Sequence, residues 1–227
     1  TSYDSALISR MVKFKVNFDI NDWASWAEMA NINSRAINFA LAYNTELFQN
    51  EDARRAGFNA RSYTTFCNLI GHIDNWSNTK SASLIINLAE GCFNDTNNII
   101  GGLFHQFISR KLDQLIDPET MITGEIEEVC KKIRNNVYEN GTYNGAIASL
   151  LATRLLNGSI KMLTSKGVKE SVVCNRIKEL LERCGDSSDR FFSEDLIFNL
   201  IKVLTNKCPA RTKSLLLDPT VRTKILS

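Results

Sequence analysis

The stretch from Asp22 to Asn44, DWASWAEMANINSRAINFALAYN, decides the fold class of this chain. Its tryptophans and alanines recur at the spacing of one helix face, which predicts a helix that begins near Asp22. The polar break at residues 31–33 predicts the end of that helix, and Ser34 is expected to cap a second helix that runs to about Phe48. The positions that define the first face are Trp23, Trp26, Ala27 and Ala30.

The cap of the first helix is predicted to be Asp19 or Asn21, because both have short polar side chains that accept hydrogen bonds from a helix N-terminus. The two tryptophans are interpreted as core residues, with a ligand-stacking platform as the alternative. The same reasoning predicts a buried set in the following helices. The predicted core residues are Trp23, Trp26, Phe39, Phe66, Leu69 and Phe107.

The rest of the chain continues the helical pattern, and its apolar spacing gives an all-α, mainly helical class. The exception is residues 11–18, where apolar and polar residues alternate as in a half-buried strand. No such alternation is sustained after Phe18. The further helices are predicted at residues 62–73, 81–89, 96–116, 124–138, 143–164, 169–184, 193–206 and 210–216.

Composition is that of an ordinary globular protein, and its 227 residues allow one large or two small domains. The net charge of +2 does not indicate a nucleic-acid or membrane partner. The six cysteines lack metal-ligand spacing, so no metal site is expected. Helix-interior cysteines such as Cys67, Cys130 and Cys174 are interpreted as small buried apolar residues, and a reducing, cytoplasmic compartment is expected. No apolar run is long enough to predict a membrane span.

Two short motifs point to a family. SALISRM, which contains Arg10, resembles the ALLSRF signature that ends the catalytic core of AAA+ ATPases. NARSY, which contains Arg61, resembles the sensor-two motif at the start of the AAA+ lid. Residues 22–44 are similar to the lid of MoxR-like AAA+ proteins. The resemblance covers residues 1 to about 120 and implies an AAA+ lid-type helical bundle followed by a helical extension.

The phosphate-binding loop of such an ATPase, GxxxxGK[ST], does not occur in the sequence. We therefore expect the nucleotide-binding core to lie upstream of Thr1. The implied division is residues 1–18 as the end of that core, 19–122 as the lid and 123–227 as a helical C-terminal extension. ATP and Mg²⁺ would be bound mainly by the upstream core, and this chain is not expected to hydrolyse ATP by itself.

The resemblance gives the two arginines separate roles. Arg10 is expected to act as an arginine finger toward a neighbouring subunit's nucleotide, neutralising charge on the transferring phosphoryl group. Arg61 is expected to reach the nucleotide phosphates of its own subunit. The alternative for each is a solvated surface arginine, and Ala60 stands where the family usually has proline. Arg54 and Arg55 are poorer candidates, in a predicted loop at residues 49–60.

The implied function is a ring-forming, MoxR-like remodelling ATPase with a protein client. One alternative is a helical protein-interaction module without a nucleotide role. Another is the lid of a DNA-transaction AAA+ protein of the clamp-loader type. The basic pairs Arg110-Lys111 and Lys131-Lys132 have acidic neighbours, so they are interpreted as solvated helix faces rather than as phosphate contacts. The two histidines, at positions 72 and 105, have no partner pattern typical of catalysis.

Overall fold

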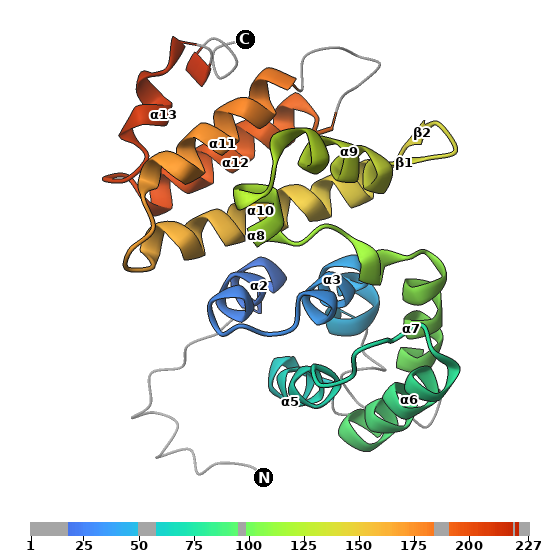
Figure 1. Ribbon diagram of the computed structural model, residues 1–227. Coiled ribbons are helices and arrows are strands. Elements are labelled where there is room, and N and C mark those ends of the chain that lie inside the picture. The colour runs from blue at the N-terminus through green and yellow to red at the C-terminus, as the bar shows by residue number, and fades with distance from the viewer. Residues whose placement is uncertain (1–17, 50–57, 95–98, 184–190, 220, 223–227) are drawn as a thin grey trace, which may run out of the picture.

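A computed structural model describes residues 18–49, 58–94, 99–183, 191–219 and 221–222. These residues are mainly helical, as predicted, with one short antiparallel β-hairpin (Figure 1). The predicted strand at residues 11–18 and Arg10 lie outside the described residues, except for Phe18, which is not in a strand. In the described part of the chain, no helix is both long and apolar enough to cross a bilayer.

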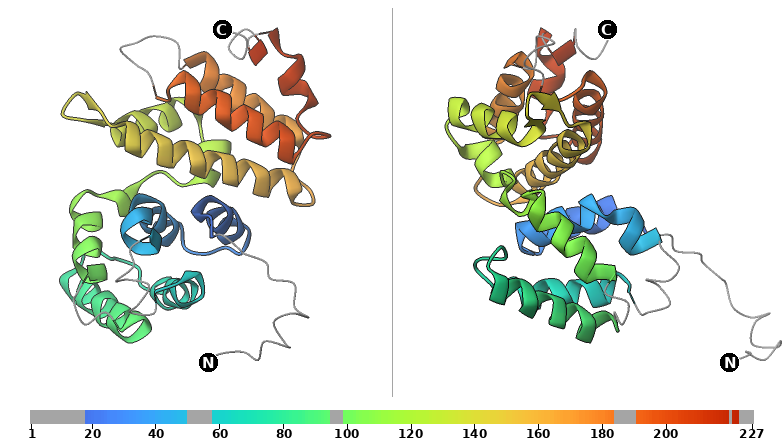
Figure 2. Two further views of the ribbon diagram at one scale, coloured as in Figure 1. Left: turned by 180° about the vertical axis from the view of Figure 1, so that it is seen from behind. Right: turned by 90° about the vertical axis from the view of Figure 1, so that its right-hand side faces the viewer.

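The helices form two groups, and α10 of the second group lies against the first group (Figures 1 and 2). The first group is α2 (Ile20–Met29), α3 (Ser34–Ala42), η1 (Thr45–Gln49), α5 (Ala60–Ile70), α6 (Thr79–Phe93), α7 (Ile99–Ser109) and η2 (Leu112–Gln114). The second group is α8 (Pro118–Thr123), α9 (Ile126–Val137), β1 (Tyr138–Glu139), β2 (Thr142–Tyr143), α10 (Gly145–Thr164), α11 (Glu170–Arg183), α12 (Glu194–Lys207) and α13 (Lys213–Leu217). Helix α10 packs on α2 and α3 from the first group and on α8 and α12 from its own.

Asparagine and aspartate side chains start several of these helices. Asp19 caps α2 by accepting a hydrogen bond from the backbone N–H of Asn21 at 2.7 Å, which confirms one of the two predicted caps. Asn33 rather than Ser34 caps α3, and Asn78 caps α6. A capping side chain satisfies backbone N–H groups that have no partner within the helix, so the helix boundaries are specified locally.

Aromatic side chains fill the core of the first group. Phe39, Phe66 and Phe107 are buried as predicted, and Tyr63 lies between Phe39 and Phe58. Trp23 is buried and packs against Tyr63, with ring centroids 5.3 Å apart. Such contacts add specific ring geometry to the burial of apolar area.

Two of the predicted core residues are exposed. Trp26 is 48% exposed and Leu69 is 45% exposed, so these predictions were wrong. Trp26 lies about 60° around α2 from Trp23, at 100° per residue. The inward face of α2 is centred on Ala24 and Ala27, on the other side of Trp23, and this leaves Trp26 in solvent.

Two helices end more than five residues before their predicted ends, and one short helix differs from the predictions altogether. The helix predicted to run to Phe48 ends at Ala42, and the chain turns there so that Leu47 is buried. The helix predicted at residues 96–116 ends at Ser109, because Lys111 adopts the left-handed conformation with φ of 55°. A short helix that was not predicted, α8, follows with Pro118 in its first turn.

The β-hairpin was also not predicted. Tyr138 pairs with Tyr143 across a turn formed by Asn140 and Gly141, with φ of 51° and 79°. Asn-Gly is the preferred pair for a two-residue hairpin turn, because both positions need positive φ. The Asn140-Gly141 dipeptide was therefore a readable signal, although each strand is too short to show alternation.

The buried and exposed tryptophans of α2 give a test of the core. Trp23→Ala removes a buried ring and should lower the free energy of unfolding by about 3–5 kcal/mol. Trp26→Ala should change it by less than about 0.5 kcal/mol, because that ring is half exposed. Urea unfolding of both variants measures the difference, and similar losses for the two would contradict this account of α2.

Candidate functional site

Helix α5 starts with a capping box that fixes the position of Arg61. Asn59 Oδ1 accepts hydrogen bonds from the backbone N–H groups of Arg61 and Ser62, each at 3.0 Å. The Ser62 hydroxyl in turn accepts from the Asn59 N–H at 3.0 Å. Arg61 is the second residue of the helix and is exposed. Its guanidinium therefore stands at a helix N-terminus, where backbone N–H groups also favour an anion.

The next residues hold α5 against the rest of the first group. Tyr63 is fully buried, and its hydroxyl donates a hydrogen bond to the Ala36 carbonyl at 2.7 Å. Burial raises the pKa of Tyr63 well above its ordinary value, so the hydroxyl stays protonated and remains a donor. Trp23 Nε1 donates to Thr64 Oγ1 at 3.2 Å. Arg61 is thus carried on a helix that is fixed to α2 and α3.

The structure locates Arg61 but not its predicted counterpart. Arg10, Arg54 and Arg55 lie outside the described residues, so their relation to Arg61 stays a prediction. His72 and His105 are described and exposed. Among the described residues, no group of three or more His, Cys, Asp or Glu side chains could hold a metal ion.

The cysteines predicted to be buried are buried. Cys67, Cys130 and Cys174 are each less than 9% exposed, and Cys92 is partly exposed. Burial raises the pKa of the Cys67 thiol to about 12, so very little thiolate forms near neutral pH. The three buried cysteines therefore pack as small apolar side chains in the core and are not nucleophiles.

A buried arginine on α10 was missed by the sequence analysis. Arg154 is 1% exposed, and its guanidinium faces α2 and α3. Nε donates to the carboxylate of Glu28, which forms an ion pair with it. Nη1 donates to Asn38 Oδ1 and to the Ser34 carbonyl, the latter at 2.9 Å. Nη2 donates to the Ser34 hydroxyl. One side chain thus connects α10 to both α2 and α3.

Burial lowers the pKa of Arg154, and the neighbouring Glu28 carboxylate opposes that shift. The group stays protonated because arginine starts from a pKa above 12. Removing two charges from water is costly, so the arrangement depends on nearly complete hydrogen bonding. The signal in the sequence was Arg154 itself, a single charged residue within the apolar stretch from Leu150 to Leu156.

Two grooves open on either side of the contact between α10 and the first group. One has a volume of about 450 Å³ and is bordered by Arg154, Asp117 and Lys161. Lys161 Nζ donates to Asn31 Oδ1 at 2.7 Å across its rim. The other has a volume of about 680 Å³ and is bordered by Tyr43 and Arg110. The helix contact between them positions α2 and α3 relative to α10.

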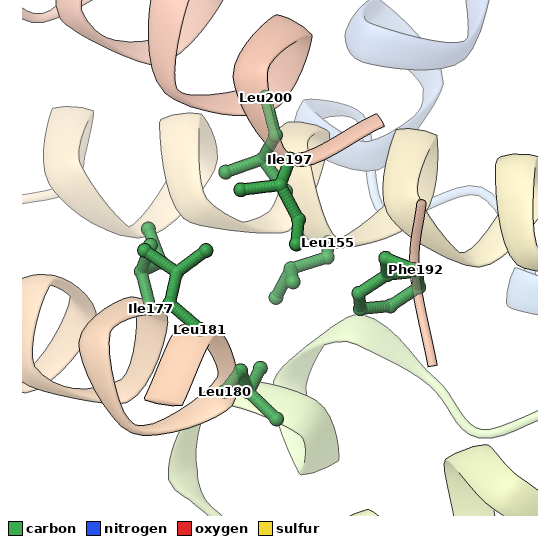
Figure 3. A pocket seen from close by; sticks show the side chains of 7 residues that line it. All are labelled: Leu155, Ile177, Leu180, Leu181, Phe192, Ile197 and Leu200. Atoms are coloured by element: carbon green, nitrogen blue, oxygen red, sulfur yellow. The ribbon is translucent and has the colours of Figure 1, made fainter. Parts of the chain in front are cut away.

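A third cavity lies inside the second group, between α10, α11 and α12 (Figure 3). Its volume is about 10 Å³ and its lining is entirely apolar. The side chains of Leu155, Leu180 and Phe192 point toward it from three segments. A space of this size holds about one water-sized probe, and apolar cavities stay dry, so it is a packing defect rather than a ligand site.

Comparisons of the chain with protein-family models, with curated proteins and with solved structures each found no match.

The ion pair on α10 gives a quantitative test. Arg154→Met leaves the buried Glu28 carboxylate without its cation and should lower the free energy of unfolding by about 3–5 kcal/mol. Adding Glu28→Gln to it should cost less than the sum of the single changes, with a coupling of about 0.5–3 kcal/mol. Urea unfolding of the four proteins in this cycle measures the coupling.

The exposed pair of Arg183 and Glu127 is the matched control for that cycle. Arg183→Met should leave stability nearly unchanged, because solvent screens an exposed pair. If Arg154→Met were as mild as Arg183→Met, the buried network would not hold α10 in place.

Thiol labelling tests the burial of the cysteines. In the native protein at pH 8, iodoacetamide should modify Cys92 well before Cys67, because Cys92 is partly exposed and Cys67 is enclosed. Peptide mass spectrometry after timed labelling gives the order. Equal rates at the two positions in native protein would contradict the packing of α5, and labelling in urea supplies the reference in which both should react.

Proposed function

We propose that this chain is the C-terminal part of a ring-forming, MoxR-like AAA+ ATPase that remodels protein partners. The support is the pair of motifs around Arg10 and Arg61, together with a mainly helical architecture. The observation that carries the proposal is the exposed Arg61 in the first turn of α5, on a helix fixed to α2 and α3.

Arg61 would act on the nucleotide bound by its own subunit. An arginine presents a planar set of N–H donors that matches the oxygens of a phosphate. The capping box fixes the backbone of Arg61 at the start of α5, so a phosphate that held the guanidinium would act on the helix through that backbone. Contact with a γ-phosphate would therefore be converted into a rotation of the lid.

ATP and Mg²⁺ would be held mainly by a phosphate loop and acidic residues upstream of this chain. Bound there, they supply the phosphoryl group that is transferred and the cation that neutralises its charge. Arg10 would reach the nucleotide of the adjacent subunit in the ring. Its guanidinium would stabilise negative charge that develops as the phosphoryl group leaves.

The buried Arg154 network offers a path for the lid motion. It joins α2 and α3 of the proposed lid, residues 19–122, to α10 of the proposed extension, residues 123–227. Because the network is buried and hydrogen-bonded from several sides, α2, α3 and α10 would move together as one unit. The extension would then transmit lid movements to a protein client.

The test uses the ring-forming protein that includes the upstream core. Arg10→Ala should reduce ATP turnover by about 10³-fold or more, with little loss of nucleotide affinity, because the finger acts on the transition state. Arg61→Ala should also reduce turnover. Arg110→Ala is the control, since Arg110 is an exposed arginine of the same helical group. Steady-state hydrolysis and nucleotide-binding titrations separate the two effects.

A mixing experiment assigns the finger to the neighbouring subunit. Subunits with Arg10→Ala, combined with subunits that lack only the phosphate-loop lysine, should recover part of the hydrolysis. An intact loop then lies beside an intact finger at some interfaces. If Arg10→Ala and Arg61→Ala both left turnover unchanged, the nucleotide role would be wrong, and the helical interaction module would replace it.

A further inference from the structure

One end of the second helical group carries a concentration of positive charge. The turn between α10 and α11 lies at the same end as the C-terminus of α12 and the segment that leads to α13 (Figures 1 and 2). A contact from Cys174 Sγ to the Arg211 carbonyl at 3.6 Å ties the start of α11 to that segment. We call this surface the basic end, and its residues are Lys161, Lys166, Lys169, Lys207, Arg211 and Lys213.

The segments that form the basic end contain few acidic residues. In residues 161–170 and 207–213, Glu170 is the single acidic side chain, and Asp117 and Glu119 line the groove that Lys161 borders. The start of α12, at the opposite end, carries Glu194 and Asp195. Along the rest of α11, acidic and basic side chains are mixed and paired, so the run of cations distinguishes the basic end from the rest of the second group.

The cations of the basic end form no ion pair in the described part of the chain. Elsewhere on α11, Arg176, Lys178 and Arg183 each form an ion pair with a carboxylate. Among the residues that the structure describes, no ion pair involves the side chains of the basic end. Lys161 makes its hydrogen bond to Asn31, a neutral group. All but Lys161, which is partly buried, are exposed to solvent and can meet an external anion.

Helix dipoles explain part of this pattern and leave the rest unexplained. Lys161 and Lys207 lie in the last turns of α10 and α12, where positive charge is favourable. Lys169 immediately precedes α11, and Lys213 is the first residue of α13. Positive charge is unfavourable at a helix start, so the fold gains nothing from these two positions. Their charge is better explained by something that binds there.

We propose that the basic end binds the phosphate backbone of duplex nucleic acid. The six cations belong to segments that meet at one end of the helical bundle, and each can contact one backbone phosphate. No aromatic ring is among them, so bases have no stacking platform, and contact would be independent of base sequence. This proposal does not rest on the nucleotide role of Arg61.

Exposed apolar side chains lie beside two of the six cations. Leu216 and Leu217 follow Lys213 by three and four residues in α13, and Val172 follows Lys169 by three residues at the start of α11. An anionic membrane, which such apolar side chains could enter, is therefore the competing ligand that the test must separate from nucleic acid.

The test measures binding of the full chain to a fluorescent DNA duplex two helical turns long by anisotropy. If six phosphates are contacted, a log–log plot of affinity against salt should have a slope of about −5. Affinity should then fall by about 10³-fold between about 50 and 200 mM salt. The triple change Lys166→Gln, Lys169→Gln and Lys213→Gln should make the slope shallower by about 3.

The matched control is Lys80→Gln, Lys131→Gln and Lys132→Gln, which removes three exposed lysines outside the basic end. It should bind like the unaltered chain, and thermal unfolding should show that both variants are folded. Absence of duplex binding at about 50 mM salt, or equal binding by the two triple variants, would overturn the proposal. So would binding to vesicles of phosphatidylserine and phosphatidylcholine without binding to DNA, which would indicate a membrane surface.

Discussion

The relation between the two halves of this fold depends on one buried cation. Arg154 is enclosed between α10 and the pair α2–α3, and its guanidinium donates to Glu28, Asn38 and Ser34. An uncompensated charge in that position would be very unfavourable, so each partner must be in place when the helices come together. The network therefore specifies one arrangement of α2, α3 and α10, where apolar contact alone would tolerate several. The two grooves beside α10 flank this contact.

Close backbone approach supports the same arrangement from the other side of α10. A Cβ at Gly158 would come within 2.5 Å of the Cβ of Pro118, so the glycine allows α8 to lie directly on α10. Asp117 caps α8 through the backbone N–H of Thr120. Burial raises the pKa of Asp117, but the hydrogen bonds from Thr120 outweigh it, and the net shift is downward. The carboxylate is thus kept ionised near Arg154, where its negative charge helps to balance the cation.

Charge serves different purposes in different parts of the molecule. Inside, Arg154 is paired and fixes an orientation. At the start of α5, Arg61 is exposed, and its helix is anchored by Tyr63. At the basic end, most of the cations are exposed and form no ion pair among the described residues. The buried charge of Arg154 stabilises the fold, whereas the exposed charges of Arg61 and of the basic end can contact ligands.

The sequence by itself determined the mainly helical class and most helix boundaries. Apolar periodicity and asparagine or aspartate caps act within a few residues. The cap at Asp19 and the burial of Phe39 could therefore be predicted from the sequence alone. The motif around Arg61 placed it at a helix start, as observed. Tertiary structure alone decided that Trp26 faces solvent, because the buried flank of a helix depends on its neighbours. It also decided the partners of Arg154, which come from 116 to 126 residues earlier in the chain. The basic end was likewise hidden, because its lysines gather only when the ends of three helices meet in space.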